Sequence, residues 1–298
     1  MSTAIETTGA GHRYGDFWAL RDCSLSLPEG SITAIVGPNG AGKTTLLNMI
    51  VGLLPASEGE LRVVGVQPSS HPDFLAQVGF LAQDSPLYKE FSVADLLRFG
   101  RAMNPAWDDA LARERLAAAE VPLNRRAGKL SGGQRAQLAL TLAVAKHPEL
   151  LILDEPVASL DPLARREFLQ TLMEATAEHE LSVILSSHVV ADLERVCDYL
   201  IVLIGSRVHV AGEVDVLLAS HHLLTGPRRD PASLPGDWQV ISASHTDRQS
   251  TLLVRADGPI LDPAWPVEQV SLEDLVLAYM SQSAGTRRRS RPVLEVQK

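Results

Sequence analysis

The residues best suited to chemistry lie in a glycine-rich loop between two apolar runs, residues 32–36 and 46–50. The loop consists of Gly37, Pro38, Asn39, Gly40, Ala41, Gly42, Lys43, Thr44 and Thr45. Glycines at this spacing let backbone N–H groups converge on a polyphosphate at the N-terminus of a helix. Lys43 would add a positive charge toward the β- and γ-phosphates, and Thr44 would offer a hydroxyl to Mg²⁺. This phosphate loop predicts a nucleotide site, but alone it does not identify the reaction.

A pair of carboxylates follows another apolar run. Residues 150–153 lead directly into Asp154 and Glu155, and a continuous apolar run is typical of a strand buried on both faces. The two acids are therefore expected at the carboxyl end of that strand, where open α/β sheets bind their ligands. Residues 181–185 predict another buried strand, which delivers His188 to the same edge. A lone histidine is more often structural, but this position favours a functional role.

Two further segments predict the beginnings of helices. In the segment Leu130-Ser131-Gly132-Gly133-Gln134, Ser131 is placed as an N-cap, and the apolar residues after it recur at helical spacing to about Lys146. The N–H groups of this helix start form a second potential anion site, although an ordinary capped turn is the alternative interpretation. Asp161 as N-cap and Pro162 predict a helix that reaches about Glu178.

The elements that must position these residues are mainly alternating strands and helices. Residues 3–27 predict two antiparallel strands, and Tyr14 between them could stack on a nucleotide base, although packing within a strand explains it as well. Further strands are expected at 58–66, 78–82 (just before Gln83), 150–153, 181–185 and 199–204. Helices are expected from the phosphate loop to about Leu54, at 93–102, at 108–120 and, in a short turn, through Val196. The pattern predicts an α/β fold with helices around a mainly parallel sheet.

The composition changes from about Gly212. A helix at 214–220 precedes a loop or linker at 226–231, strands are plausible at 238–243 and 251–256, and Ser271 caps a helix to about Ser281. We therefore expect a small α+β extension over residues 221–284. The basic tail, residues 285–298, could touch anionic lipid, but a solvated, disordered end is the favoured interpretation.

Composition excludes several classes of protein. The 298 residues include 45% hydrophobic residues and carry a net charge of −9, which argues against a protein that coats nucleic acid. No apolar run is long enough for a membrane span and no signal peptide is evident, so a soluble, cytoplasmic chain is expected. Cys23 and Cys197 are too few for a disulfide framework or a zinc site, and buried thiols are favoured.

Taken together in order, these motifs resemble the ATP-binding cassette (ABC) family over residues 3–220. The shared landmarks are the phosphate loop, Gln83 after a strand, Leu130 to Gln134, the strand into Asp154 and Glu155, Ser159-Leu160-Asp161, and His188. The Leu130 to Gln134 motif is the most specific of them. The resemblance implies the P-loop NTPase fold of ABC ATPases: a mainly parallel sheet, an N-terminal antiparallel β subdomain, and a helical subdomain over about 84–146.

The resemblance also implies a role for each site residue. Two such domains sandwich two ATP molecules, so this chain would pair with itself or with a homologue. Glu155 would polarise the attacking water, His188 would bond the γ-phosphate, and Gln83 would sense Mg²⁺ and γ-phosphate. Mg²⁺ would be held by Thr44, Gln83 and Asp154. Nucleotide contacts would come from Tyr14 (with Phe17 as a minor rival), residues 37–45 and Asp161, and across the dimer interface from Ser131, Gly132, Gly133 and Gln134.

The leading functional interpretation is the ATP-hydrolysing subunit of a transporter. Integral membrane permease chains would dock near residues 83–99 and hold the protein on the cytoplasmic face of the membrane. Residues 270–275, leading into Tyr279, are similar to the ending of bacterial drug- and antibiotic-exporter ATPases, which favours export. The alternative is a soluble ABC ATPase that acts on DNA, ribosomes or an assembly factor. A kinase or GTPase is disfavoured by the Leu130 to Gln134 motif and by the lack of a guanine-reading motif.

Overall fold

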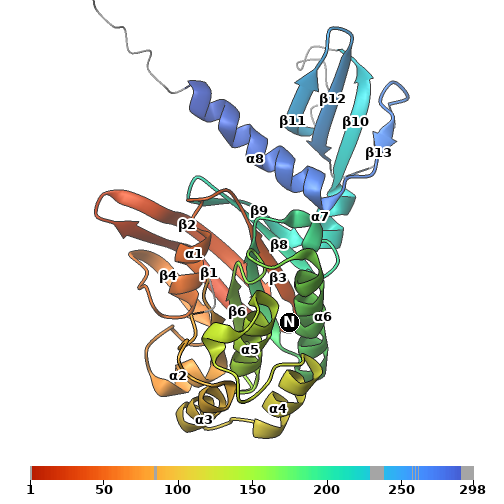
Figure 1. Ribbon diagram of the computed structural model, residues 1–298. Helices are drawn as coiled ribbons and strands as arrows, with labels where there is room; N and C mark the ends of the chain where they lie inside the picture. The colour runs from red at the N-terminus through yellow and green to blue at the C-terminus, as the bar shows by residue number, and fades with distance from the viewer. Residues whose placement is uncertain are drawn as a thin grey trace, which may run out of the picture.

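The computed structural model of the protein describes residues 2–83, 86–228, 238–256, 258, 260 and 262–289, with the backbone alone described for His179 and residues 282–289. Its centre is a sheet with the strand order β5-β6-β7-β3-β8-β9 (Figure 1). These strands are β5 (Val78–Leu81), β6 (Leu150–Asp154), β7 (Ser182–Ser187), β3 (Ile32–Val36), β8 (Tyr199–Ile204) and β9 (Arg207–Glu213). All neighbouring strands run parallel except the pair β8 and β9, which is antiparallel. The predicted α/β fold with a mainly parallel sheet is therefore confirmed.

The apolar runs predicted as buried strands are buried on both faces. Every residue of β3, β6 and β7 is buried, as expected for strands covered by other elements on each side. Strand β9 is absent from our prediction, in which the last strand of the core ends at Ile204. Its pairing with β8 adds the antiparallel edge that parallel sheets often carry.

A second sheet covers one face of the core. It has the order β2-β1-β4, built from β1 (Thr3–Tyr14), β2 (Phe17–Pro28) and β4 (Glu58–Val63). The antiparallel pairing of β1 with β2 agrees with the prediction. Helix α1 (Lys43–Ile50) shares one apolar cluster with this sheet and with the parallel strands. It ends earlier than the predicted Leu54 because Gly52 turns the chain at a positive φ of 77°.

Helices cover the opposite face. Helix α5 (Gly132–Val144) and helix α6 (Pro162–His179) pack on the sheet, in a cluster that includes Leu140, Phe168 and Leu172. A separate small core joins α5 to two helices that match the predicted helices closely, α3 (Val93–Met103) and α4 (Asp109–Ala118). The 3₁₀ turn η1 (Ala127–Lys129) adds Ala127 to this small core, whereas the short helix α2 (Pro72–Gln77) packs through Phe74 on the cluster of α1 and the second sheet.

The segment after β7 is less helical than predicted. Only the 3₁₀ turn η2 (Val190–Asp192) is regular, and irregular turns lead from it to β8. Val190, Leu193 and Val196 nevertheless point into the core. Cys23 and Cys197 are buried free thiols, as expected, and burial raises the pKa of Cys23 to about 11.

The C-terminal part forms its own sheet beside the parallel one (Figure 1). After α7 (Val214–Ser220), the strands β10 (His221–Pro227), β11 (Gln239–His245), β12 (Gln249–Arg255) and β13 (Val267–Glu268) assemble in the order β11-β12-β10-β13. Helix α8 (Leu272–Arg289) begins after Ser271, whose hydroxyl accepts from the Asp274 N–H at 3.1 Å.

Two predictions for this region are wrong. The start of the predicted linker, Gly226 and Pro227, lies in strand β10. The glycine serves close packing and not flexibility, since a Cβ there would approach the Trp265 ring to 2.6 Å. Residues 285–289, predicted to start a disordered tail, continue helix α8, whereas residues 229–231 and 290–298 lie outside the described residues. Within the described part of the chain, no helix combines the length and hydrophobicity needed to cross a membrane.

Candidate functional site

The phosphate loop connects the buried strand β3 to helix α1. Two of its glycines are required by close approaches: a Cβ on Gly37 would lie 2.2 Å from the Leu203 carbonyl oxygen, and one on Gly42 would lie 2.5 Å from that of Ala19. Gly42 also has a φ of 105° as the N-cap of α1, a conformation that other residues rarely adopt. The first N–H groups of α1 have no partner within the helix and can bind an anion.

Lys43 is the buried cation of this loop. Its side chain is only 6% exposed, and its ammonium donates to the Gly37 carbonyl at 2.8 Å. The ammonium also lies 3.6 Å from Glu155 Oε1. A charge this well buried is stable only beside such partners, so the loop and the acid strand β6 are electrostatically joined.

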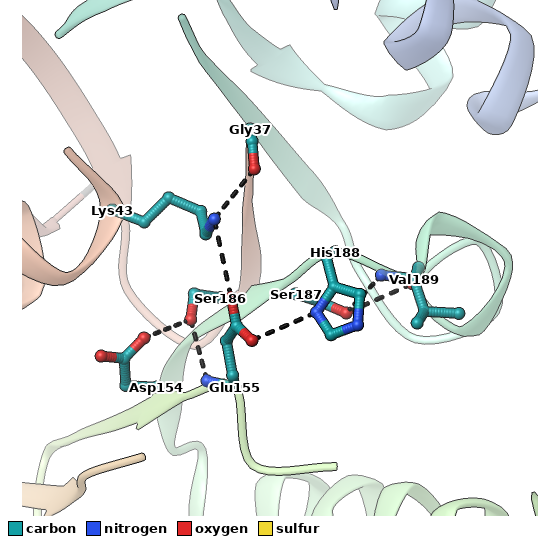
Figure 2. A network of polar contacts seen from close by, with 8 residues as sticks. All are labelled: Gly37, Lys43, Asp154, Glu155, Ser186, Ser187, His188 and Val189. Atoms are coloured by element: carbon teal, nitrogen blue, oxygen red, sulfur yellow. Dashed lines mark hydrogen bonds and ion pairs between the residues drawn. The ribbon is translucent and has the colours of Figure 1, made fainter. Parts of the chain in front are cut away.

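The two acids at the end of β6 are held from the neighbouring strand β7 (Figure 2). The Ser186 hydroxyl donates to Asp154 Oδ1 at 2.6 Å and accepts from the Glu155 N–H at 2.9 Å. His188, just beyond β7, places Nδ1 at 3.1 Å from Glu155 Oε2. The structure thus brings Lys43, Asp154, Glu155 and His188 together at one edge of the sheet.

Glu155 departs from ordinary backbone geometry. Its φ is +47°, a left-handed conformation that is uncommon for a residue with a side chain. Such outliers cluster at functional sites, where surrounding contacts hold them in place. The Glu155 carboxylate is bracketed by Lys43 on one oxygen and by His188 on the other, so its orientation is fixed.

A pocket of about 540 Å³ opens above the phosphate loop. Its lining is Tyr14, Phe17, Ala19, Asn39, Gly40, Ala41, Gly42, Lys43, Thr44, Thr45, Gln83 and Glu155. The volume lies within the range of small-molecule sites, and the glycine cradle with its buried lysine fits a polyphosphate. The structure thus places Gln83 beside the loop, although about forty residues separate the two in sequence.

Tyr14 and Phe17 both reach this pocket. They are cross-strand neighbours at the tip of the β1–β2 hairpin, 54% and 66% exposed. Because the Tyr14 ring is exposed, packing within the strand does not explain it. Both rings are accessible to a nucleotide base. Tyr14 is the better fixed of the two, because the buried His12 ring contacts it edge-to-face at 4.6 Å between centroids.

The segment Ser131 to Gln134 and the residue Asp161 do not line this pocket. Ser131 caps α5, since its hydroxyl accepts from the Gln134 N–H at 3.1 Å. The side-chain oxygen of Gln134 in turn accepts from the Ser131 N–H. Asp161 caps α6 through the N–H groups of Leu163 and Ala164. Pro38 is likewise absent from the lining. Gly132 instead lines a second cavity of about 470 Å³, which also includes Gln83 and Glu155.

Oxygen donors for a hard cation are available beside the loop. Thr44 is exposed to the pocket, Gln83 lines it, and Asp154 is buried directly behind Glu155. A hydroxyl, an amide oxygen and a carboxylate are ligands that suit Mg²⁺, so the donor set fits this ion. Among the described residues, no group of three or more His, Cys, Asp or Glu side chains could hold a metal.

Ser186 is the polar residue that sequence reasoning did not assign. It is fully buried near the end of strand β7, and a buried hydroxyl implies a hydrogen-bond partner. A buried serine therefore indicates that a hydrogen-bond partner exists. That partner lies on β6, and only the pairing of β6 with β7 identifies it.

Comparison with known proteins gives consistent results. Residues 20–158 match the protein-family profile described as ABC transporter. The chain is 34% identical over 205 residues to the thiamine import ATP-binding protein ThiQ of Salmonella choleraesuis, covering 66% of this chain and 86% of that protein. It is also 34% identical over 221 residues to the Nod factor export ATP-binding protein I of Rhizobium johnstonii, covering 72% and 71%.

The chain also resembles solved structures, and it spans only part of the length of several relatives. A solved structure described as the ATP binding subunit of an ABC transporter matches with a TM-score of 0.65 and 27% identity, covering 73% of this chain and 92% of that one. In several other bacterial relatives, 32% to 34% identical, the matched region spans only 61% to 64% of the relative's length.

Proposed function

The chain belongs to the ABC transporter family, and from this premise we propose that it binds and hydrolyses ATP to drive a membrane transporter. The observation that supports this most is that Lys43 and Glu155 both line the phosphate-loop pocket, while His188 contacts the Glu155 carboxylate. In this proposal the loop N–H groups and Lys43 hold the phosphates, and Tyr14 stacks on the base.

Hydrolysis of ATP requires an oriented water and groups that stabilise spread negative charge. Glu155 is suited to orient that water because both of its carboxylate oxygens are held, by Lys43 and by His188. His188 would then bond the γ-phosphate. Mg²⁺ would neutralise charge between the phosphates, held by Thr44, Gln83 and Asp154. No base stronger than a carboxylate is needed.

The proposed active form is a dimer around two ATP molecules. Ser131 to Gln134 and Asp161 lie outside the pocket of their own chain, which supports a role for them at the site of a second subunit. Ser131, Gly132 and Gly133 form the capped start of α5, and a helix start favours a phosphate. The partner is a second copy of this chain or a homologue.

An exposed aromatic cluster supports the proposed contact with a permease. Tyr88, Phe91 and Phe99 are 62%, 40% and 46% exposed. Tyr88 stacks on Phe91 with 5.2 Å between centroids and meets Phe99 edge-on at 6.1 Å. An exposed patch of large apolar side chains is typical of an interaction surface. Docked there, the protein would lie at the cytoplasmic face of the membrane.

We further propose that the transporter driven by this protein exports its substrate. It is supported by the sequence of residues 270–279 and by the similarity to a relative named for export. The similarity to ThiQ, a relative named for import, gives no support to that direction. Uptake and efflux assays on cells that carry or lack the protein distinguish the two.

Affinity purification from membranes tests the transporter assignment. A polytopic membrane protein should copurify with the tagged chain, and Tyr88→Ala with Phe99→Ala should lose it while ATP hydrolysis persists. Val216→Ala is the matched control, because Val216 is 59% exposed on another element, α7. Recovery of ribosomes, DNA-repair proteins or an assembly factor, with no membrane protein, would support the soluble alternative instead.

Lys43→Ala tests whether the phosphate loop carries the chemistry. The change removes the buried cation and should abolish ATP binding and ATP-dependent dimerisation together. Binding of a fluorescent ATP analogue and sizing chromatography with Mg-ATP measure the two effects. Loss of one without the other would show that the two functions do not depend on the same loop.

A further inference from the structure

Ser186 occupies a position at which one hydroxyl contacts two acids. The side chain is fully buried, and its oxygen lies 2.6 Å from Asp154 Oδ1 and 2.9 Å from the Glu155 backbone nitrogen (Figure 2). A backbone N–H can only donate, so the hydroxyl hydrogen must point to Asp154. The direction of both hydrogen bonds is therefore fixed.

One hydrogen bond restrains the side chain of Asp154, and the other restrains the backbone of Glu155. The bond to Oδ1 fixes the Asp154 carboxylate and leaves Oδ2 as its second oxygen. The bond from the Glu155 N–H satisfies a backbone donor at a residue with a φ of +47°, where an unsatisfied donor would be costly. Without this acceptor, the backbone of Glu155 would lose the contact that holds it in an unfavourable conformation.

Strand β7 and the residue that follows it contact Glu155 at two points. Ser186 holds the Glu155 backbone, and His188, just beyond the end of the strand, contacts the Glu155 carboxylate at 3.1 Å. The parallel register that pairs Asp154 with Ser186 brings these groups together.

We propose that Ser186 is a positioning residue for ATP hydrolysis, which sets Asp154 for Mg²⁺ and Glu155 for the attacking water. The inference rests on the proposed ATPase activity. Ser186 does not line the phosphate-loop pocket, and in this proposal it acts through the two acids that its hydroxyl contacts. Groups that orient metal ligands and catalytic acids typically change affinity or activity by about 10- to 100-fold when they are removed.

The test compares Ser186→Ala with Ser182→Ala. Ser182 lies at the other end of the same strand, is also buried, and uses its hydroxyl to accept from the Gly30 N–H at 3.0 Å. Both variants lose a buried hydroxyl from β7, so both should lose similar stability in urea unfolding. Only Ser186→Ala removes contacts with Asp154 and Glu155.

The expected result for Ser186→Ala is a kcat about 10- to 100-fold lower. The Mg²⁺ concentration for half-maximal activity should rise, and ATP affinity measured without Mg²⁺ should stay within about twofold of wild type because the phosphate loop is unchanged. Ser182→Ala should keep wild-type kcat and Mg²⁺ dependence. This combination separates positioning from general destabilisation.

Two results would overturn the inference. Wild-type kcat and Mg²⁺ dependence in Ser186→Ala would show that the hydroxyl does not position the acids. An equal loss of kcat in Ser182→Ala would show that any weakening of β7 has the same effect. Failure of the wild-type protein itself to hydrolyse Mg-ATP would instead contradict the proposed function.

Discussion

Glu155 is the residue on which the proposed chemistry depends most. Its carboxylate lies between Lys43 Nζ, at 3.6 Å, and His188 Nδ1, at 3.1 Å. Glu155→Gln keeps the shape of the side chain but removes its charge. We expect ATP still to bind, hydrolysis to fall by about 100-fold or more, and the ATP-bound dimer to persist. Sizing chromatography with Mg-ATP and a phosphate-release assay measure these effects. An unchanged monomer with normal turnover would show that Glu155 has another role.

A close backbone approach requires a glycine at position 42 of the phosphate loop. Gly42→Ala should abolish ATP binding, because the new Cβ would lie 2.5 Å from the Ala19 carbonyl oxygen at a φ of 105°. Gly65→Ala, outside the phosphate loop, is the matched control, since its φ of 75° is also positive but no atom lies within 4 Å of the added Cβ. The control should lose about 1 kcal/mol of stability from backbone strain and keep binding. Equal loss of ATP binding in the two variants, measured by calorimetry, would contradict the steric argument.

The sequence predicts which residues belong to the site better than it predicts which of them contact one another. Lys43, Glu155 and His188 could be identified because motifs place each of them next to an apolar run. Their mutual contacts, and the role of Ser186, could not be predicted because they depend on the register between β6 and β7. The preference for Tyr14 over Phe17 likewise depends on a contact that the sequence does not show, the edge-to-face packing of the His12 ring on Tyr14.

Among the elements, the strands of the parallel sheet were the most predictable. A strand that is buried on both faces is built from a continuous apolar run. Such a run can be recognised in the sequence alone. The last two residues of strand β10, Gly226 and Pro227, were predicted as the start of a linker because both are typical turn residues. The Trp265 ring over Gly226 explains the glycine, but that contact joins residues far apart in sequence.

The junction of α7, β10 and α8 contains a buried histidine. His221 is 1% exposed, donates through Nδ1 to the Leu217 carbonyl at 2.7 Å, and accepts through Nε2 from the Tyr279 hydroxyl at 3.0 Å. Burial lowers its pKa below 6.5; the nearby Arg255 and His222 also lower it, and the bond to Leu217 opposes them. The junction therefore favours the neutral ring.

This histidine should make the junction sensitive to acid. The unfolded chain binds a proton at His221 more readily than the folded chain, so the stability that His221 contributes falls as pH drops below about 6.5. Between pH 7.5 and 5.5, the wild type should lose more unfolding free energy than His221→Gln, which cannot titrate. Urea unfolding at each pH measures the difference. Parallel losses in the two proteins would show that another group causes the pH dependence.

Across the whole molecule, one segment joins the C-terminal unit to the proposed active site. It begins at His188, is tied to α6 by the Asp192–Arg165 ion pair at 3.1 Å, and is tied to α8 by Glu194, which accepts from the Leu272 N–H at 3.3 Å. Leu272 also shares an apolar cluster with Val190 and Leu193 of this segment. The C-terminal unit therefore holds the chain that carries His188.

Two buried leucines of the C-terminal unit should consequently differ in their effect on ATP hydrolysis. Leu272→Ala opens a cavity beside residues 190–193 and should lower kcat several-fold, besides costing about 2–5 kcal/mol of stability. Leu252→Ala removes the same group from the separate cluster around Trp265, so it should be destabilised comparably with unchanged kcat. Steady-state assays below the unfolding range, with hydrogen exchange at residues 188–197, compare them. If both leave kcat and exchange at wild-type values, the packing of Leu272 does not influence His188.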